Sequence, residues 1–185
     1  MPLVVIKDAQ LGYKNPVIGP LSFSVDLGER LGIWGPNGCG KSTLLKYFCH
    51  DATLFEGSIE IDPDIQIAYQ PQQPITPQEI PLTGYEYLAL MGADRAQVPE
   101  RLKTFLGQRV DKLSGGQFQI LSTWANLASQ GKLVLLDEPT NNLDPEAIDL
   151  LVHTILAMPQ EHGLIVVSHE KSFIDKVATR TLDIF

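Results

Sequence analysis

The sequence contains few cysteines, little positive charge and no long apolar run. Only Cys39 and Cys49 occur among 185 residues, too few for a disulfide framework, which favours a reducing cytosol. The net charge of −8 argues against a general binder of nucleic acid, because affinity for phosphate backbones comes from clustered Lys and Arg. No run of 18 apolar residues is present to span a membrane, and residues 1–8 lack a basic leader. These absences predict a cytoplasmic protein.

The length and the apolar content fit one domain. A chain of 185 residues with 44% hydrophobic residues can form a substantial core with a small appended lobe, whereas two independent domains would leave each of them small. The sequence has no internal repeat and no low-complexity tract. Prolines are densest over residues 71–81, which makes this stretch the best candidate for a joint between lobes. We therefore expect a single domain over residues 1–185.

Residues 35–43, GPNGCGKST, fit the phosphate-binding pattern G-x-x-x-x-G-K-[S/T]. An apolar stretch from Arg30 to Trp34 precedes the loop, and apolar residues at helical spacing follow over residues 42–50, which is the strand-loop-helix context that the motif requires. This context favours a nucleotide site over the alternative of a glycine-rich structural turn with a surface lysine. The predicted contacts with a nucleoside triphosphate are Gly35, Pro36, Asn37, Gly38, Cys39, Gly40, Lys41, Ser42 and Thr43.

The chemistry of the loop predicts the role of each residue type. Gly35, Gly38 and Gly40 permit positive φ angles and leave no Cβ in the way, so that backbone N–H groups can turn inward around a β-phosphate. Lys41 can reach the β- and γ-phosphates, and the Ser42 hydroxyl is placed to bind Mg²⁺. The cofactors predicted from this segment are ATP and Mg²⁺.

The remaining pattern predicts an α/β fold in which strands and helices follow one another. Ser114 is a natural helix N-cap, with Gln117 three residues later as in a capping box, and Asp144 followed by Pro145 marks another helix start. A turn is expected over residues 15–20. Strands are expected over residues 3–6, 21–27, 30–34, 57–62, 65–69, 132–139 and 164–167, and helices over residues 42–50, 85–91, 99–106, 114–128 and from residue 145.

Two adjacent carboxylates end the apolar run that begins at Lys132. Beside a phosphate loop, the first of them, Asp137, is expected to hold the Mg²⁺ shell, and Glu138 is placed to accept a proton from an attacking water. The alternative is a pair of surface charges that cap a strand. His169 follows the apolar run over residues 164–167, at the strand edge where α/β folds place ligand-contacting residues, although a single histidine there is often an ordinary surface residue.

Together these motifs resemble the ATP-binding cassette (ABC) ATPase family over essentially the whole chain. Residues 113–117, LSGGQ, match the signature of that family, and residues 141–144, NNLD, match its D-loop. The resemblance implies that Gln72, with Gln70 as the alternative, is the Q-loop glutamine, and that Tyr13 stacks on adenine. It also implies catalytic roles for Lys41, Gln72, Glu138 and His169, magnesium ligands in Ser42, Gln72 and Asp137, and further nucleotide contacts from Ser114, Gly115, Gly116 and Gln117.

The fold that this resemblance implies is a P-loop cassette with a mainly parallel core sheet, an N-terminal antiparallel β-subdomain and a short α-helical subdomain over roughly residues 73–128. In that architecture two cassettes form an ATP-dependent homodimer, with the phosphate loop of one facing the LSGGQ segment of the other. His169 would hold the γ-phosphate, and Gln72 would report the nucleotide state to the helical lobe. One departure is that Phe118, Gln119 and Ile120 stand where transporter cassettes commonly have basic residues, which leaves open how this helix is braced.

Three functional classes remain open from the sequence. The first is the ATP-binding subunit of an ABC transporter, peripheral on the cytoplasmic face of the inner or plasma membrane, with a separate permease and a substrate-binding protein as partners. Residues 81–92 resemble the segment after the Q-loop in metal-ion importers, although their apolar side chains also suit the core of the lobe. The second is a soluble ATPase similar to the ribosome-associated ABC-F group, whose motifs residues 139–144 and 168–174 resemble. The third is a cassette that binds ATP without turnover.

The sequence favours the transporter subunit. ABC-F proteins carry two cassettes joined by a long charged linker, whereas this sequence has one cassette and an acidic balance poorly suited to ribosomal RNA, so no direct nucleic-acid partner is expected. The presence of Lys41, Asp137, Glu138 and His169 disfavours a cassette without turnover. The substrate and the direction of transport stay open.

Overall fold

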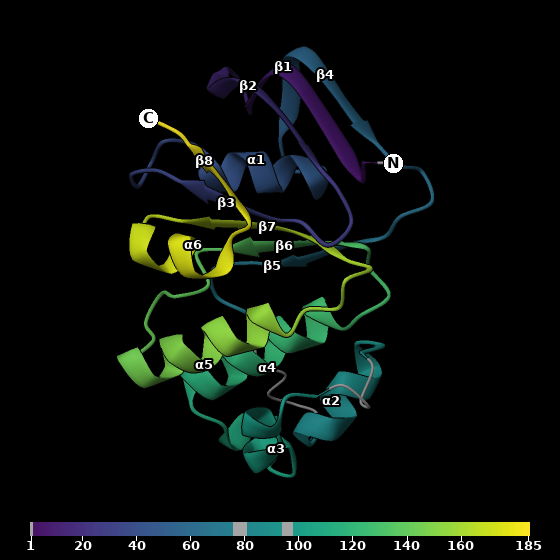
Figure 1. The fold of residues 1–185 in the computed structure, drawn as a ribbon, viewed down its shortest axis with the longest axis vertical. Coiled ribbons are helices and arrows are strands. Elements are labelled where there is room, and N and C mark those ends of the chain that lie inside the picture. Colours follow the sequence, from purple (N-terminus) through teal and green to yellow (C-terminus); the bar gives the residue numbers. More distant parts are fainter. Residues whose placement is uncertain (1, 76–80, 94–97) are drawn as a thin grey trace.

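The computed structural model describes residues 2–75, 81–93 and 98–185. Figure 1 shows the elements in layers along the long axis: a small sheet, helix α1 (Lys41–Phe48), a second sheet, the helices α4 (Gly115–Leu127) and α5 (Pro145–Leu156), and below them α2 (Gly84–Leu90) and α3 (Glu100–Leu106). The described elements therefore form the antiparallel sheet, parallel core sheet and helical segments that the resemblance implied.

The core sheet is parallel throughout its described strands. Its order is β5 (Ile67–Gln70), β6 (Leu133–Asp137), β7 (Gly163–Ser168), β3 (Arg30–Trp34) and β8 (Arg180–Asp183). Every residue of β6 and β7 is buried, as expected for central strands that are covered on both faces. Because parallel strands end on the same side, the segments after β3, β5, β6 and β7 meet at one edge of the sheet.

The antiparallel sheet is larger than the sequence indicated. Its strands are β1 (Val4–Gly12), β2 (Pro16–Val25) and β4 (Thr53–Ile61), in the order β2-β1-β4. The turn predicted over residues 15–20 is wrong for most of its length, because β2 already begins at Pro16 and the reversal is confined to the residues just before it. The buried Ile18 pairs with Leu11 of β1, and this apolar contact keeps the segment extended despite its Pro and Gly content.

Local capping fixes where three helices begin. The predicted capping box of α4 is confirmed, since Ser114 Oγ accepts from Gln117 N and Gln117 Oε1 accepts from Ser114 N. Asp144 accepts from Ala147 N at 2.8 Å and so caps α5, with Pro145 at its first turn. Thr83 caps α2 in the same way. Two elements complete the described list: the 3₁₀ turn η1 (Val110–Lys112) and helix α6 (Lys171–Val177).

The two faces of the parallel sheet carry two separate cores. One face packs against α1 and the antiparallel sheet, through residues such as Leu44, Leu45 and Leu135. The other packs against α4, α5 and α6 and continues into α2 and α3, with Trp124 of α4 fully buried. Of the helices in this second core, α2, α3 and α4 lie within residues 73–128, the range predicted for the helical lobe, whereas α5 and α6 lie outside it. Residues 76–80 of the proline-rich joint are outside the described part of the chain.

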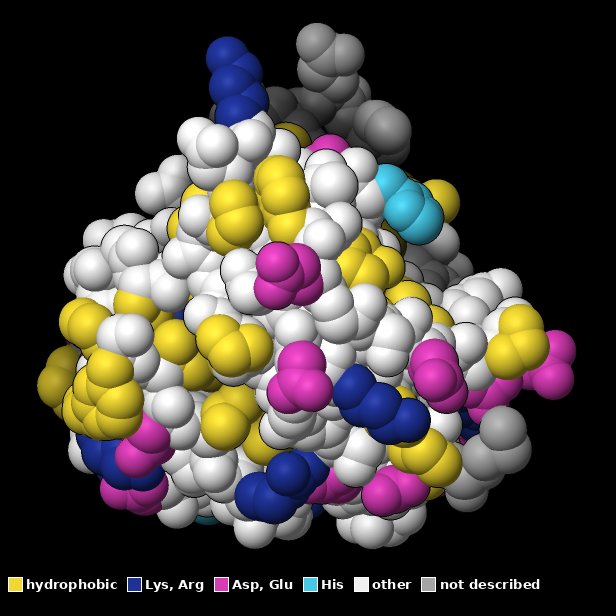
Figure 2. Space-filling model, turned by 90° about the horizontal axis from the view of Figure 1, so that it is seen from above, with side chains coloured by type: hydrophobic (Ala, Val, Ile, Leu, Met, Phe, Trp, Pro, Cys, Tyr) yellow, Lys and Arg dark blue, Asp and Glu magenta, His cyan; other side chains and the backbone are white. Residues whose placement is uncertain are grey.

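The helices and the surface bear on whether the chain crosses a membrane or binds nucleic acid. None of the helices in the described ranges is long and apolar enough to cross a bilayer. Figure 2 views the molecule from the end that carries the antiparallel sheet, and on this face acidic and basic side chains are interspersed among apolar ones. This face therefore does not offer the concentrated positive charge that binding to a nucleic-acid backbone requires.

Candidate active site

The phosphate loop connects β3 to α1 and depends on its glycines for two different reasons. Gly38 and Gly40 have φ angles of 84° and 97°, in the left-handed region that the loop was expected to use. Gly35 is not among the residues with positive φ. A Cβ at Gly35 would lie 2.4 Å from the carbonyl oxygen of Ile184, so this position requires glycine because two backbone segments approach closely.

Lys41 lies at the start of α1 with its ammonium group buried in the loop. Its Nζ donates to the carbonyl oxygens of Gly35 (2.7 Å) and Pro36 (3.0 Å), and it lies 3.2 Å from Glu138 Oε1. The side chain is only 4% exposed, so the charge is held at a fixed place with little screening by solvent. A phosphate group entering the loop would meet this ammonium directly.

Ser42 and Asp137 form the part of the site that suits a divalent cation. Ser42 Oγ donates to Asp137 Oδ1 at 2.9 Å, and the Tyr69 hydroxyl donates to Asp137 Oδ2 at 3.3 Å. Burial raises the pKa of Asp137, and the hydrogen bonds from Ser42 and Tyr69 work in the opposite direction. A hydroxyl and a carboxylate are the hard oxygen ligands that Mg²⁺ prefers when phosphates supply further ligands, so this pair fits the predicted metal.

Glu138 and His169 are brought together at the carboxyl ends of neighbouring strands. His169 Nδ1 lies 2.8 Å from Glu138 Oε2, and His169 N donates to the same oxygen at 3.2 Å. An ionised carboxylate only accepts hydrogen bonds, so Nδ1 carries a proton and the other ring nitrogen, Nε2, is left for a ligand. Glu138 has a φ angle of 45°, in the strained left-handed region that residues other than glycine rarely adopt.

Lys41, Ser42, Glu138 and His169 line one cavity of about 450 Å³, whereas Asp137 reaches it only through its contact with Ser42. Gln72 lines this cavity, whereas Gln70 is 1% exposed and donates from Nε2 to the carbonyl oxygen of Gln119 at 3.4 Å. Of the two candidates, only Gln72 therefore has access to a nucleotide. The lining residues are Tyr13, Val17, Asn37, Gly38, Gly40, Lys41, Ser42, Thr43, Lys46, Gln72, Glu138, Asn141 and His169.

Three of these lining residues were missed by the sequence reasoning. Lys46 lies four residues after Ser42 on α1, so helical periodicity could have placed both side chains on one face. Asn141 was recognised only as part of the D-loop pattern, and Val17 was assigned to a turn. Among the predicted nucleotide contacts, Gly35 and Pro36 accept hydrogen bonds from Lys41 through their carbonyl oxygens. Cys39 is partly buried and packs against the core under the antiparallel sheet.

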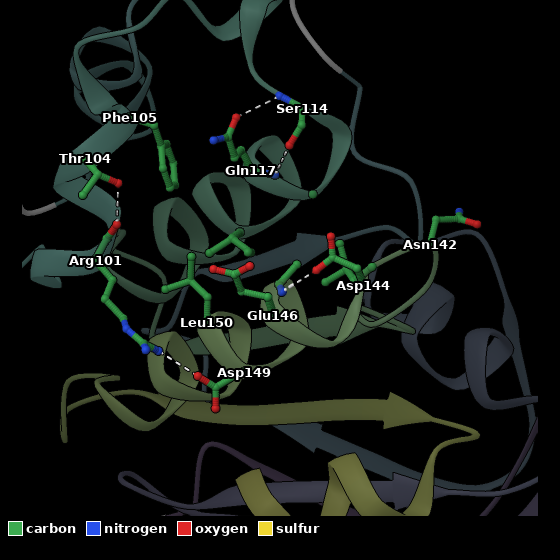
Figure 3. A pocket seen from close by; sticks show the side chains of 14 residues that line it. Arg101, Thr104, Phe105, Ser114, Gln117, Asn142, Asp144, Glu146, Asp149 and Leu150 are labelled. Carbon is green, nitrogen blue, oxygen red and sulfur yellow. Dashed lines mark hydrogen bonds and ion pairs between the residues drawn. The ribbon is translucent and has the colours of Figure 1, made fainter.

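The signature segment does not line the phosphate cavity of its own chain. Ser114, Gly116 and Gln117 line a different cavity of about 570 Å³ between α3, α4 and α5. Figure 3 shows Ser114 and Gln117 hydrogen-bonded to each other at the first turn of α4, on the opposite side of the cavity from Asp149. A Cβ built at Gly115 would contact nothing within 4 Å, so the backbone at this helix start is open to approach.

Residues 18–141 match the family model described as ABC transporter. The zinc import ATP-binding protein ZnuC of Paracoccus denitrificans is 30% identical over 98% of this chain and 75% of its own length. The energy-dependent translational throttle protein EttA of Mycobacterium tuberculosis is 33% identical over 97% of this chain and 34% of its own length. The chain spans about a quarter to a third of the length of the first relatives that it matches, from 24% to 34%.

Solved structures match the fold across nearly the whole chain. The ATP-binding subunit of an ABC transporter superposes with a TM-score of 0.78 at 26% identity, covering 98% of this chain and 85% of that one. A bacterial Atm1-family ABC exporter with ATP bound superposes with a TM-score of 0.75 at 24% identity, covering 99% of this chain and 37% of the other. At 24% identity, the match to the exporter shows a similar fold and nothing further.

Proposed function

This chain belongs to the ABC transporter family of ATP-binding cassettes, and from that membership we propose that it binds and hydrolyses Mg²⁺-ATP. In this proposal two copies pair around the ATP, and hydrolysis drives a separate membrane permease. One observation carries the proposal. Lys41, Glu138 and His169 form a continuous chain of contacts at 3.2 Å and 2.8 Å around the same cavity. A cassette that only held ATP would not need a buried base in contact with both the phosphate-binding lysine and a histidine.

The roles of the residues follow from their contacts. Lys41 holds the phosphates, and Glu138 accepts a proton from a water whose oxygen attacks the γ-phosphorus. The bond from that phosphorus to the bridging oxygen of ADP breaks, so that ADP and inorganic phosphate are the products. His169 keeps Glu138 oriented through Nδ1 and directs Nε2 to the γ-phosphate. Ser42, Asp137 and Gln72 would hold Mg²⁺, which supplies charge neutralisation for the phosphates.

The proposed pairing of two copies rests on the position of the signature segment. Ser114 and the N–H groups of Gly115 and Gly116 form a helix start suited to an anion. The cavity that Ser114 and Gly116 border is not the one that Lys41 lines. A second copy can bring its own signature segment to the phosphates in the loop of the first. ATP would then belong to the interface, and hydrolysis would loosen it.

We predict that Ser114→Asp prevents the ATP-dependent dimer while Ser114→Asn largely keeps it. Asp and Asn are both good helix N-caps and have nearly the same size, so α4 keeps its start in both variants. Only Asp places a negative charge against the γ-phosphate, which should weaken ATP-dependent pairing at least about tenfold. Sedimentation of each variant with and without ATP measures the effect. Equal dimer formation by the two variants would contradict the proposed pairing.

The proposed transport role rests on the likeness to ZnuC and on the surface of α2. Leu90 is 67% exposed and Met91 37% exposed, and both belong to the segment that resembles metal-ion importers. We take these two neighbouring apolar side chains at the end of α2 as the proposed point of contact with a protein partner. The proposed partners are a permease at the cytoplasmic face of the membrane and, through it, a substrate-binding protein.

We predict that the protein, when tagged and recovered from detergent-solubilised membranes, brings down a polytopic membrane protein. Leu90→Glu should reduce that recovery severalfold without changing ATP affinity, because a carboxylate in an apolar contact is costly to desolvate. Leu156→Glu, at another exposed leucine, is the matched control. If the tagged protein were recovered only together with ribosomes, the transport role would be overturned. That result would favour the ABC-F-like alternative, which the likeness to EttA supports.

A further inference from the structure

The last side chain before the phosphate loop is bonded to the segment that carries His169. Trp34 ends β3 and directly precedes Gly35, and it pairs with Ser168 in the sheet. Its indole Nε1 donates to the carbonyl oxygen of His169 at 3.0 Å. The backbone of His169 is thus held at its N–H by Glu138 and at its carbonyl by Trp34.

Groups from the C-terminal part of the chain orient the indole ring. The Phe185 ring meets it edge-on, with centroids 5.8 Å apart and planes at 83°. Lys171 Nζ lies 5.8 Å from the ring centroid and pairs with Asp175 at 3.1 Å and Asp183 at 3.7 Å. These edge-to-face and cation–π contacts favour one orientation of the ring, the one in which Nε1 points at His169.

A second contact holds the same segment from the other side. Thr140 follows Glu138 by two residues and is 2% exposed, and its hydroxyl donates to Glu170 Oε1 at 3.0 Å. Glu170 N in turn donates to Ser168 Oγ at 3.0 Å. The segment 168–170 is therefore connected to β3 on one side and to the turn after β6 on the other.

We propose that Trp34 and Glu170 are positioning residues that hold His169, and through it the Glu138 carboxylate, in the orientation needed for hydrolysis. This inference rests on the proposed ATPase function. Neither residue is among the described residues that line the nucleotide cavity, so both act through His169. Because His169 N and Nδ1 both contact Glu138 Oε2, any displacement of this segment moves the base relative to the attacking water.

The first experiment compares variants that lose the Thr140–Glu170 hydrogen bond with variants that keep it. Thr140→Val and Glu170→Ala should lower kcat about threefold to tenfold, the effect expected of one hydrogen bond, with the Kd for ATP changed by less than about twofold. Thr140→Ser and Glu170→Gln keep a donor and an acceptor and should restore kcat. The double variant Thr140→Val/Glu170→Ala should be no slower than the slower single variant, because both remove the same bond.

The second experiment removes the indole N–H. Trp34→Phe should lower kcat by a similar factor while the Kd for ATP stays within about twofold. Trp124→Phe is the matched control, since Nε1 of Trp124 has no hydrogen-bond partner among the described residues. This control should lower the thermal midpoint through lost packing and leave kcat unchanged.

The outcomes separate this inference from the function on which it rests. If the wild-type protein hydrolyses ATP and the Trp34→Phe and Glu170→Ala variants have the same kcat, the positioning roles alone are overturned. If these variants lose kcat and ATP affinity equally, and Glu170→Gln does not restore kcat, the effect is a general structural one, and the positioning roles are again overturned. Wild-type protein without ATPase activity would overturn the proposed function and the positioning roles together.

Discussion

Glu138→Gln is expected to reduce ATP turnover by at least about a hundredfold, because a positioned general base contributes roughly 10²- to 10⁴-fold to the rate. The Glu138 side chain is 8% exposed, and its carboxylate is held by Lys41 on one oxygen and by His169 on the other. Glutamine has the same shape and keeps a carbonyl oxygen that can accept from His169, but it cannot take a proton from water. The loss should therefore fall on kcat and spare ATP binding.

The same variant should make the ATP-bound dimer persist. If closure precedes hydrolysis, a protein that binds ATP and cannot cleave it remains in the closed state. Size-exclusion chromatography with ATP should show a dimer for Glu138→Gln and mainly monomer for the wild type after turnover. Steady-state phosphate release gives kcat in the same samples.

Glu60→Gln is the control for the loss of one negative charge. Glu60 is exposed on β4, and its contact with Lys7 is long, at 3.9 Å, so this substitution should leave turnover and pairing unchanged. A Glu138→Gln protein that hydrolysed ATP at close to the wild-type rate would show that Glu138 is not the base. His169 would then be the next residue to test, because it contacts Glu138 and lines the same cavity.

Lys41→Ala is expected to weaken ATP binding by about two orders of magnitude, since hydrogen bonds to charged groups contribute roughly 1.5–3 kcal/mol. The ammonium is buried at a fixed place, in contact with two loop carbonyls and Glu138, so its removal leaves the loop without the cation that it holds there. Titration of a fluorescent ATP analogue measures the Kd directly. Glu138→Gln should lose turnover and keep ATP binding, whereas Lys41→Ala should lose ATP affinity itself.

Lys41→Ala also removes the cation next to a buried carboxylate, which is destabilising on its own account. The titration should therefore be made at a temperature at which circular dichroism shows the variant to be folded. Lys7→Ala, at an exposed lysine far from the loop in sequence, is the control and should bind ATP as the wild type does. Folded Lys41→Ala protein with wild-type affinity would contradict the role of Lys41.

The local motifs were predictable because each is contiguous in the sequence. The phosphate loop, the LSGGQ helix start with its capping box and the strand that ends at Asp137 depend on neighbouring residues and on simple backbone rules. The longer antiparallel strands were less predictable. The stretch from Pro16 onward has turn-like composition, and it is a strand because it pairs with β1, with Pro16 opposite Gly12 and Ile18 opposite Leu11.

The amino-acid sequence by itself determined the phosphate cradle, the two carboxylates and the candidate histidine, since these follow from residue types at fixed spacing. The tertiary structure alone decided which groups meet: that Gln72 and not Gln70 reaches the cavity, that Ser114 borders a different cavity from Lys41, and that Trp34 contacts His169 across 135 positions of sequence. The reason is that the order of strands in the core sheet depends on the packing of the whole chain. No local sequence pattern determines which strands will be neighbours in the sheet.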